Sequence, residues 1–185
     1  MTATTRSVYR PPWRIDLTVR AGVPRLVPLV RLVWTAADAL DAAGAPRPAS
    51  IGLILADDLE LAALNAAHLG HEGPTDVLSF PLLEPSTYPA HQGQAPAARV
   101  EGRPFGLPPG RRTHLGDVVV SVERAIAQAE AGRGGQTGDV RWSAADELWL
   151  LVTHGVLHVC GWDHALHPEE VGMRALEQRL MAAAR

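Results

Sequence analysis

The chain has 185 residues, a net charge of −3 and a single cysteine. A chain of this length suits one domain, residues 1–185, that buries roughly two-thirds of the surface of its unfolded form. One cysteine excludes an internal disulfide, no apolar run forms a signal peptide or reaches the about 18 residues of a membrane span, and the negative charge confines any nucleic-acid contact to a local patch.

The first half of the chain predicts two strands and two helices. Residues 1–13 are expected to form a loose tail, after which residues 15–19 alternate apolar and polar side chains as a half-buried strand does. Apolar side chains recur at helical spacing over residues 28–43, and a second strand is expected at residues 51–55. Residues 59–67 then form a predicted helix, with a preceding aspartate as its N-cap.

The second half adds two strands and a long irregular segment. Residues 77–80 and 118–120 are expected strands, and residues 122–131 are an expected helix. Residues 84–113 are rich in Pro, Gly, Ala and Gln without an apolar period, so we expect an inserted surface loop that adds nothing to the core. A last amphipathic helix is predicted to start at Pro168.

This order of elements predicts an α+β fold, in which a small mixed four-stranded sheet packs with helices. One of these helices starts at Ser143, where Asp146 completes a capping-box-like pair. It continues as an apolar and therefore buried segment that contains His154 and His158. These two histidines are four residues apart, so they project from one face of the helix and can share a metal ion.

A glycine and a third histidine complete the predicted metal site. Gly161 can take the left-handed conformation that reverses the chain and returns His164 as a third ligand. Three nitrogen ligands leave one position for water, which is the arrangement of catalytic zinc sites. Cys160 faces away from the pair, and Gly155 stands where zinc proteases carry the glutamate of their His-Glu-x-x-His motif, so the usual general base of a protease is missing.

The segment from His154 to His164 resembles the His-Gly-x-Leu-His-x-x-Gly-aromatic-Asp-His signature of the YbeY family. Members of that family are described as bacterial metal-dependent endoribonucleases and ribosome-maturation factors. Two further segments, residues 64–81 and 115–120, match in the expected order, and the resemblance covers most of residues 50–180. It implies a zincin-like fold with the metal site on a core helix.

One segment departs from the family pattern. Residues 68–74 read His-Leu-Gly-His-Glu-Gly-Pro, whereas the family commonly has an aromatic residue followed by Arg, Gly and Lys. Leu69 therefore stands at the arginine position and His71 at the lysine position. The cation that the family pattern implies for RNA phosphate is missing, so either another arginine replaces it or RNA cleavage by this chain is weak.

Other polar residues allow two interpretations each. Asp163 is placed to hydrogen-bond a ligand imidazole or a metal-bound water, or to cap the turn after Gly161. Asp76 and Asp117 can cap turns or line a cleft, and ordinary turn chemistry favours caps. The best local candidates for phosphate binding stand just before the fourth strand, although exposed loop arginines are commonly solvated: Arg111, Arg112 and His114.

Together, the histidine spacing and the family resemblance predict a cytoplasmic endoribonuclease that holds one zinc ion, or another divalent transition metal, through His154, His158 and His164. The implied role is cleavage of single-stranded RNA in ribosomal RNA maturation, at the 3′ end of small-subunit 16S rRNA, and in ribosome quality control. The expected partners are this RNA and the small ribosomal subunit, without DNA or membrane.

Two alternatives to the endoribonuclease stay open. One is a metal-dependent amide or peptide hydrolase, which Gly155 disfavours because it removes the usual proton acceptor. The other is a non-catalytic ribosome-assembly factor whose metal is mainly structural, which Leu69 and the negative net charge keep open. The sequence assigns no catalytic residue beyond the predicted metal ligands.

Overall fold

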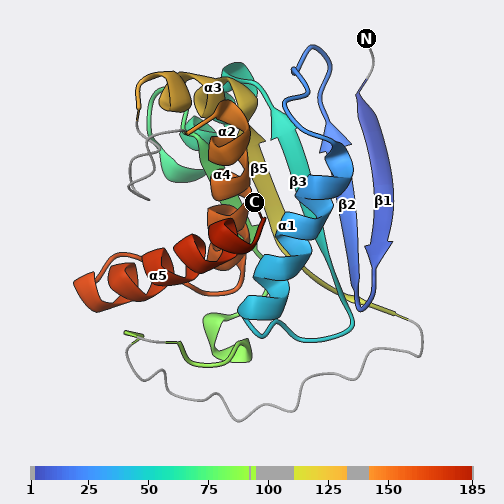
Figure 1. Ribbon diagram of the computed structural model, residues 1–185, viewed down its shortest axis with the longest axis vertical. Helices are drawn as coiled ribbons and strands as arrows, with labels where there is room; N and C mark the ends of the chain where they lie inside the picture. The colour runs from blue at the N-terminus through green and yellow to red at the C-terminus, as the bar shows by residue number, and fades with distance from the viewer. Residues whose placement is uncertain (1–2, 92, 95–110, 133–141, 185) are drawn as a thin grey trace.

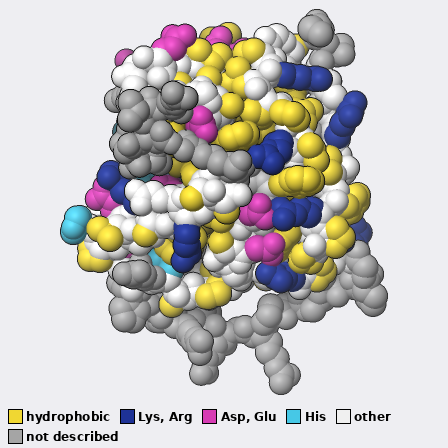
Figure 2. All heavy atoms as spheres, viewed as in Figure 1, with side chains coloured by type: hydrophobic (Ala, Val, Ile, Leu, Met, Phe, Trp, Pro, Cys, Tyr) yellow, Lys and Arg dark blue, Asp and Glu magenta, His cyan; other side chains and the backbone are white. Residues whose placement is uncertain are grey.

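The computed structural model describes residues 3–91, 93–94, 111–132 and 142–184 (Figure 1). The middle of the predicted 84–113 loop therefore lies outside the described residues. On the face drawn in Figure 2, arginine side chains are interspersed with acidic and hydrophobic ones and form no continuous basic patch.

One mixed sheet of five strands, in the order β1-β2-β3-β5-β4, organises the described chain. The strands are β1 Thr4–Arg10, β2 Trp13–Val19, β3 Ala49–Ala56, β4 Val77–Pro81 and β5 Thr113–Ser121. β2, β3 and β5 are parallel, whereas β1 and β4 pair antiparallel with β2 and β5. The predicted α+β class is confirmed, the predicted number of four strands is wrong, and the zincin-like relation stays a prediction.

The additional strand comes from the segment predicted as a loose tail. β1 pairs with β2 along its whole length, from Thr4 opposite Val19 to Arg10 opposite Trp13. Most β1 side chains are exposed and only Val8 packs against the main core, so the strand is held mainly by its pairing with β2. The prediction of a loose tail over residues 1–13 is therefore wrong for residues 4–13, because an exposed edge strand lacks the apolar alternation used to recognise strands.

Helices cover both faces of the sheet. They are α1 Leu29–Ala42, α2 Asp58–Leu69, α3 Val122–Glu130, α4 Ala144–Val159 and α5 His167–Ala184. The start of α2 is fixed as predicted, because the Asp57 side chain accepts a hydrogen bond from the Glu60 N–H at 2.9 Å. Among the described residues, no helix is long and apolar enough to cross a membrane.

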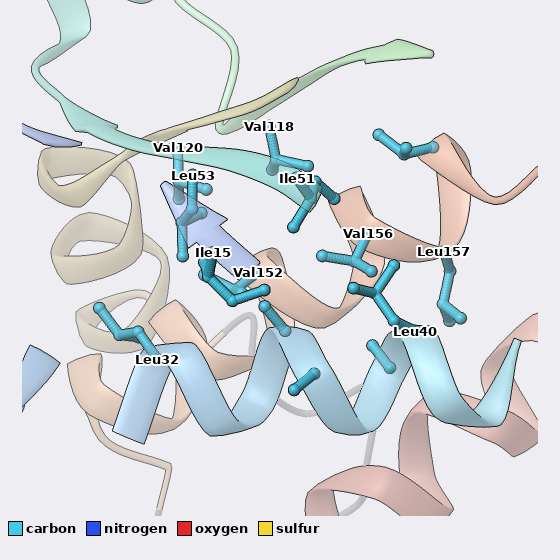
Figure 3. Close-up of a cluster of buried hydrophobic side chains, with 14 of the residues drawn as sticks. Ile15, Leu32, Leu40, Ile51, Leu53, Val118, Val120, Val152, Val156 and Leu157 are labelled. Atoms are coloured by element: carbon cyan, nitrogen blue, oxygen red, sulfur yellow. The ribbon is translucent and has the colours of Figure 1, made fainter. Parts of the chain in front are cut away.

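The main core lies between the sheet and helices α1 and α4 (Figure 3). Alternation along β5 sends Val118 and Val120 into this core, and sends Val119 to the other face of the sheet. On that face Val119 packs with Leu61 of α2 in a smaller apolar cluster. The sheet is therefore covered on both faces at β5, next to the strand edge that carries the candidate site.

The described start of the predicted surface loop is partly buried. Pro85–Thr87 form a short 3-10 turn, η1, and the following Tyr88 is only 7% exposed and belongs to the main core. His91 stacks on Trp162, with ring centroids 4.1 Å apart. The expectation that residues 84–113 add nothing to the core is therefore wrong for the first residues of the segment.

Candidate metal centre

Helix α4 carries two of the three predicted ligands, and a capping box fixes its start. The Ser143 hydroxyl oxygen accepts a hydrogen bond from the Asp146 N–H at 3.2 Å, and the Asp146 carboxylate accepts one from the Ser143 N–H at 2.9 Å. The helix is then buried along most of its length, in contact with α1, α3, α5 and strands β4 and β5. This packing holds the turn that contains His154 and His158 in a fixed position.

The three predicted ligands converge on one point. His154, His158 and His164 each offer a ring nitrogen, and these three nitrogens lie within 4.8 Å of one another. The Nε2 atoms of His154 and His158 are 3.0 Å apart. Gly161 has a φ of +80°, the left-handed conformation predicted for the turn, and the reversed chain places His164 beside the other two rings. We call these three residues the histidine triad.

A buried glutamate from another helix orients the first histidine. Glu177 of α5 places its Oε1 atom 2.7 Å from Nδ1 of His154, and its side chain is only 7% exposed. Because a carboxylate can only accept a hydrogen bond, His154 donates from Nδ1, and its Nε2 lone pair points toward the other histidines. A carboxylate behind a ligand imidazole is the usual outer partner of metal-binding histidines.

The second histidine is kept neutral by its surroundings. Burial, reinforced by the neighbouring His154 and His164 rings, lowers the pKa of His158 to about 4. At pH 7 the imidazole therefore keeps a lone pair on one ring nitrogen, which is the form that binds a metal ion.

Gly155, between the two helical histidines, packs directly against the sheet. A Cβ atom at this position would lie 2.5 Å from Val118 Cγ1 and 2.9 Å from Val77 Cγ2. The Gly155 carbonyl also accepts a hydrogen bond from the Ser79 hydroxyl at 2.9 Å. A side chain here would require the Val118 and Val77 side chains to shift, so the packing disfavours the glutamate that zinc proteases carry between their two histidines.

A cleft of about 950 Å³ opens beside the triad along the edge strand β4. All three histidines line it, together with residues 75–82 and the end of α2. Leu69 lies in this wall and is 57% exposed, so it is not a core residue. The position at which the family pattern has arginine therefore faces the same cleft as the triad.

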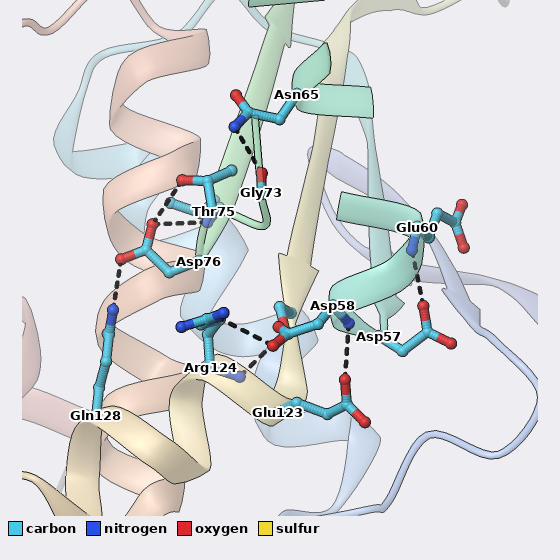
Figure 4. A network of polar contacts seen from close by, with 12 residues as sticks. Asp57, Asp58, Glu60, Asn65, Gly73, Thr75, Asp76, Glu123, Arg124 and Gln128 are labelled. Atoms are coloured by element: carbon cyan, nitrogen blue, oxygen red, sulfur yellow. Dashed lines mark hydrogen bonds and ion pairs between the residues drawn. The ribbon is translucent and has the colours of Figure 1, made fainter. Parts of the chain in front are cut away.

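Asp76 both caps a turn and lines the cleft, so the two interpretations from the sequence hold together. Its Oδ1 atom accepts hydrogen bonds from the Val77 N–H at 2.9 Å and the Thr75 hydroxyl at 3.2 Å, and its Oδ2 atom accepts one from Gln128 at 2.9 Å (Figure 4). It also lines each of the cavities that reach His154. These hydrogen bonds hold the start of β4 against α3 beside the triad.

A smaller cavity of about 320 Å³ opens on the α5 side of the triad, and a positively charged side chain stands in its wall. It is lined by His154, His164, Glu177 and Arg174, among others. Arg174 lies 2.7 Å from Glu170, one helical turn away, and its side chain is 54% exposed. Of the described residues that line these cavities, Arg174 is the only arginine.

Two further predicted residues lie near the triad. Asp163 accepts a hydrogen bond through Oδ1 from the His164 N–H at 2.7 Å, so it caps the turn after α4, and it also lines the cleft with the triad. Cys160 is buried and lies outside the triad, as predicted. Burial raises the pKa of its thiol to about 12, which keeps it protonated and unreactive.

The polar residues at the start of β5 are not brought to the cleft. The Arg112 guanidinium donates to the Pro12 carbonyl at the turn between β1 and β2. His114 lies 3.3 Å from Asp117, and neither residue lines a cavity with the triad. The prediction that Arg111, Arg112 and His114 form the local phosphate site therefore finds no support in this arrangement.

Sequence reasoning missed the two residues that α5 contributes. Met173, Leu176 and Leu180 form an apolar stripe, and Glu177 occupies a position within that stripe. A glutamate on the buried face of an amphipathic helix was the available signal, because such a carboxylate needs a partner. Nothing in the sequence indicated that Arg174 lies near the triad, since a Glu and an Arg four residues apart are an ordinary helical ion pair.

Comparison with known proteins gives consistent matches. The family model described as Endoribonuclease YbeY matches residues 28–185. A Salinispora tropica protein named Endoribonuclease YbeY is 40% identical over 148 residues, which cover 80% of this chain and 82% of that protein. A protein of the same name from Thermobifida fusca is 35% identical over 178 residues, which cover 92% of this chain and 94% of the relative.

Among solved structures, the solution structure of a Thermotoga maritima protein matches with a TM-score of 0.50 and 19% identity, covering 92% of this chain and 90% of that one. This likeness concerns the fold alone. The family model and the relatives carry the assignment, and they confirm the resemblance seen in the histidine motif. The chain belongs to the Endoribonuclease YbeY family.

Proposed function

We propose that His154, His158 and His164 hold one zinc ion and that the protein uses it to cleave single-stranded RNA. The observation that carries this proposal is the convergence of three ring nitrogens within 4.8 Å, with Glu177 hydrogen-bonded behind one of them. Three nitrogen donors with a carboxylate behind one imidazole suit zinc better than the oxygen-seeking magnesium or calcium ions. The family name supplies the reaction class.

The residues around the triad support phosphodiester hydrolysis. His154, His158 and His164 would hold the zinc ion, which when bound would supply an acidic water of pKa about 7 and positive charge for phosphoryl oxygens. Glu177 fixes the tautomer and orientation of His154. Arg174, in the cavity on the α5 side, is placed to hold a phosphate oxygen once it releases Glu170.

The biological role follows from the family. We propose that the whole chain acts in the cytoplasm as one metallohydrolase domain in the maturation of ribosomal RNA, with the 3′ end of 16S rRNA and the small ribosomal subunit as its targets. Peptide hydrolysis is disfavoured because Gly155 supplies no glutamate base and its contacts with Val118 and Val77 are too close for a side chain without a shift of those valines.

The proposed reaction is tested by incubating zinc-loaded and chelator-treated protein with single-stranded RNA and, in parallel, with a peptide library. We expect RNA fragments only from the zinc-loaded protein, no peptide fragments, and loss of RNA cleavage in His154→Ala. Cleavage of peptides, or RNA cleavage that persists in chelator and in His154→Ala, would contradict the proposal. Tight RNA binding without any cleavage would favour the non-catalytic assembly factor instead.

A further inference from the structure

The cleft along β4 has an unusual composition for a surface expected to meet RNA. None of the described residues that line it is Lys or Arg, and its carboxylates are Asp76 and Asp163. Two exposed leucines stand in its walls, with Leu69 57% and Leu82 64% exposed. Large apolar side chains left exposed in a cleft indicate a binding surface for an apolar part of a ligand.

Aromatic rings stand at two places in the same cleft. Phe80 of β4 meets His68 of α2 edge-to-face, with ring centroids 5.1 Å apart. Trp162, in the turn after α4, is held face-to-face by His91, with an angle of 10° between the ring planes. Both larger rings are therefore pre-oriented by a histidine, and both line the cleft that contains the triad.

These features fit the bases of RNA better than its backbone. Away from the triad, a phosphate would meet two carboxylates and no arginine among the described lining residues, whereas a base offers a neutral aromatic face to rings and leucines. Only a single strand can turn its bases outward in this way, because a duplex keeps them stacked inside. The triad in the same cleft places such bases beside the reacting phosphate.

We propose that the part of the cleft formed by Phe80, Leu82 and Trp162 binds the unpaired bases next to the scissile phosphate of single-stranded RNA. Stacking and apolar contact supply the affinity, and the backbone phosphates contribute little. This inference rests on the proposed function, since it assumes that RNA is the substrate. An extended peptide pairing with the open edge of β4 is the competing occupant.

If bases supply most of the affinity, binding of single-stranded RNA should depend only weakly on salt concentration. Each phosphate neutralised by a protein cation contributes about −0.7 to the slope of log affinity against log salt for a single strand. Because none of the described residues that line the cleft is Lys or Arg, Arg174 is the neighbouring cation in the described part of the chain. We therefore expect a slope of about −1 or shallower.

The test measures binding by fluorescence anisotropy, using zinc-loaded protein and a labelled single-stranded RNA oligomer, with each reading taken before RNA fragments appear on a gel. The probes compared with it are the same oligomer carrying abasic sites, an RNA hairpin duplex and an extended peptide. Leu82→Ser and Trp162→Phe probe the cleft. Leu59→Ser is the matched control, because Leu59 is 80% exposed on α2 and does not line the cleft.

We expect the abasic oligomer and the hairpin to bind at least about fivefold more weakly than the parent oligomer, as loss of one stacked base implies. Leu82→Ser and Trp162→Phe should weaken binding of the parent oligomer, and Leu59→Ser should not. The inference would be overturned if the abasic oligomer bound as tightly as the parent oligomer, or if the slope of log affinity against log salt were steeper than about −3. It would also be overturned if Leu82→Ser weakened peptide binding but not RNA binding. Binding is read without cleavage, so base-dependent binding by a protein that cuts no RNA would contradict the proposed function and leave this cleft assignment standing.

Discussion

Replacing Glu177 with alanine should weaken zinc binding by about 10- to 100-fold, the usual effect of removing the outer partner of a ligand histidine. The carboxylate accepts the Nδ1 hydrogen of His154 at 2.7 Å and holds the Nε2 lone pair toward the triad. Without it, the ring can change tautomer and rotate, and its N–H loses a largely buried acceptor. Zinc affinity is measured by competition with a chromophoric chelator.

Two further variants separate orientation from packing. Glu177→Gln keeps the shape and an acceptor oxygen but removes the charge, so its loss of affinity should be smaller than that of alanine. Glu170→Gln is the matched control on the same helix, because Glu170 pairs with Arg174 and not with a histidine of the triad. An alanine variant with the zinc affinity of the parent would show that Glu177 only fills space.

Replacing Leu69 with arginine should raise RNA cleavage by about tenfold or more. Leu69 is exposed in the cleft beside the triad, so a guanidinium there can reach a phosphate oxygen without being buried. A factor of ten corresponds to about 1.4 kcal/mol of transition-state stabilisation, within the range of a charge-assisted hydrogen bond. The same variant should steepen the salt dependence of RNA binding, because it adds one phosphate contact.

Leu59→Arg is the control for charge alone. It adds the same cation to the same helix at a position 80% exposed and outside the cleft. Cleavage by this variant should stay at the level of the parent. If Leu69→Arg is as stable as the parent but cleaves no faster, or if Leu59→Arg gains equally, the position at Leu69 does not act on the reacting phosphate.

The parts of the fold that bury an apolar face were predictable from sequence. The helical spacing over residues 28–43 corresponds to α1, and the caps at Asp57 and Ser143 are formed as expected. β1 escaped prediction because its exposed Thr, Arg and Ser side chains carry no apolar period, and only pairing with β2 makes it a strand. The burial of Tyr88 was not predicted, because a single buried ring in an irregular segment leaves no periodic pattern in the sequence.

The candidate site also has parts that the sequence predicts and parts that only the structure shows. The triad was predictable because its members lie within eleven residues of one another and the helix repeat alone places two on one face. Glu177 lies on another helix, and only tertiary packing brings it to His154. Leu69 was located by its position in a family motif, but its exposure in the cleft and the absence of arginine from the described lining needed the structure.

The most direct test of the metal centre is the zinc content of purified protein, measured by elemental analysis after dialysis. The parent should carry about one zinc ion per chain, as three convergent imidazoles require. His158→Ala should carry almost none, whereas His167→Ala should match the parent, because His167 is 85% exposed and lies outside the triad. Full zinc retention by His158→Ala would contradict the assignment of His154, His158 and His164 as the metal site.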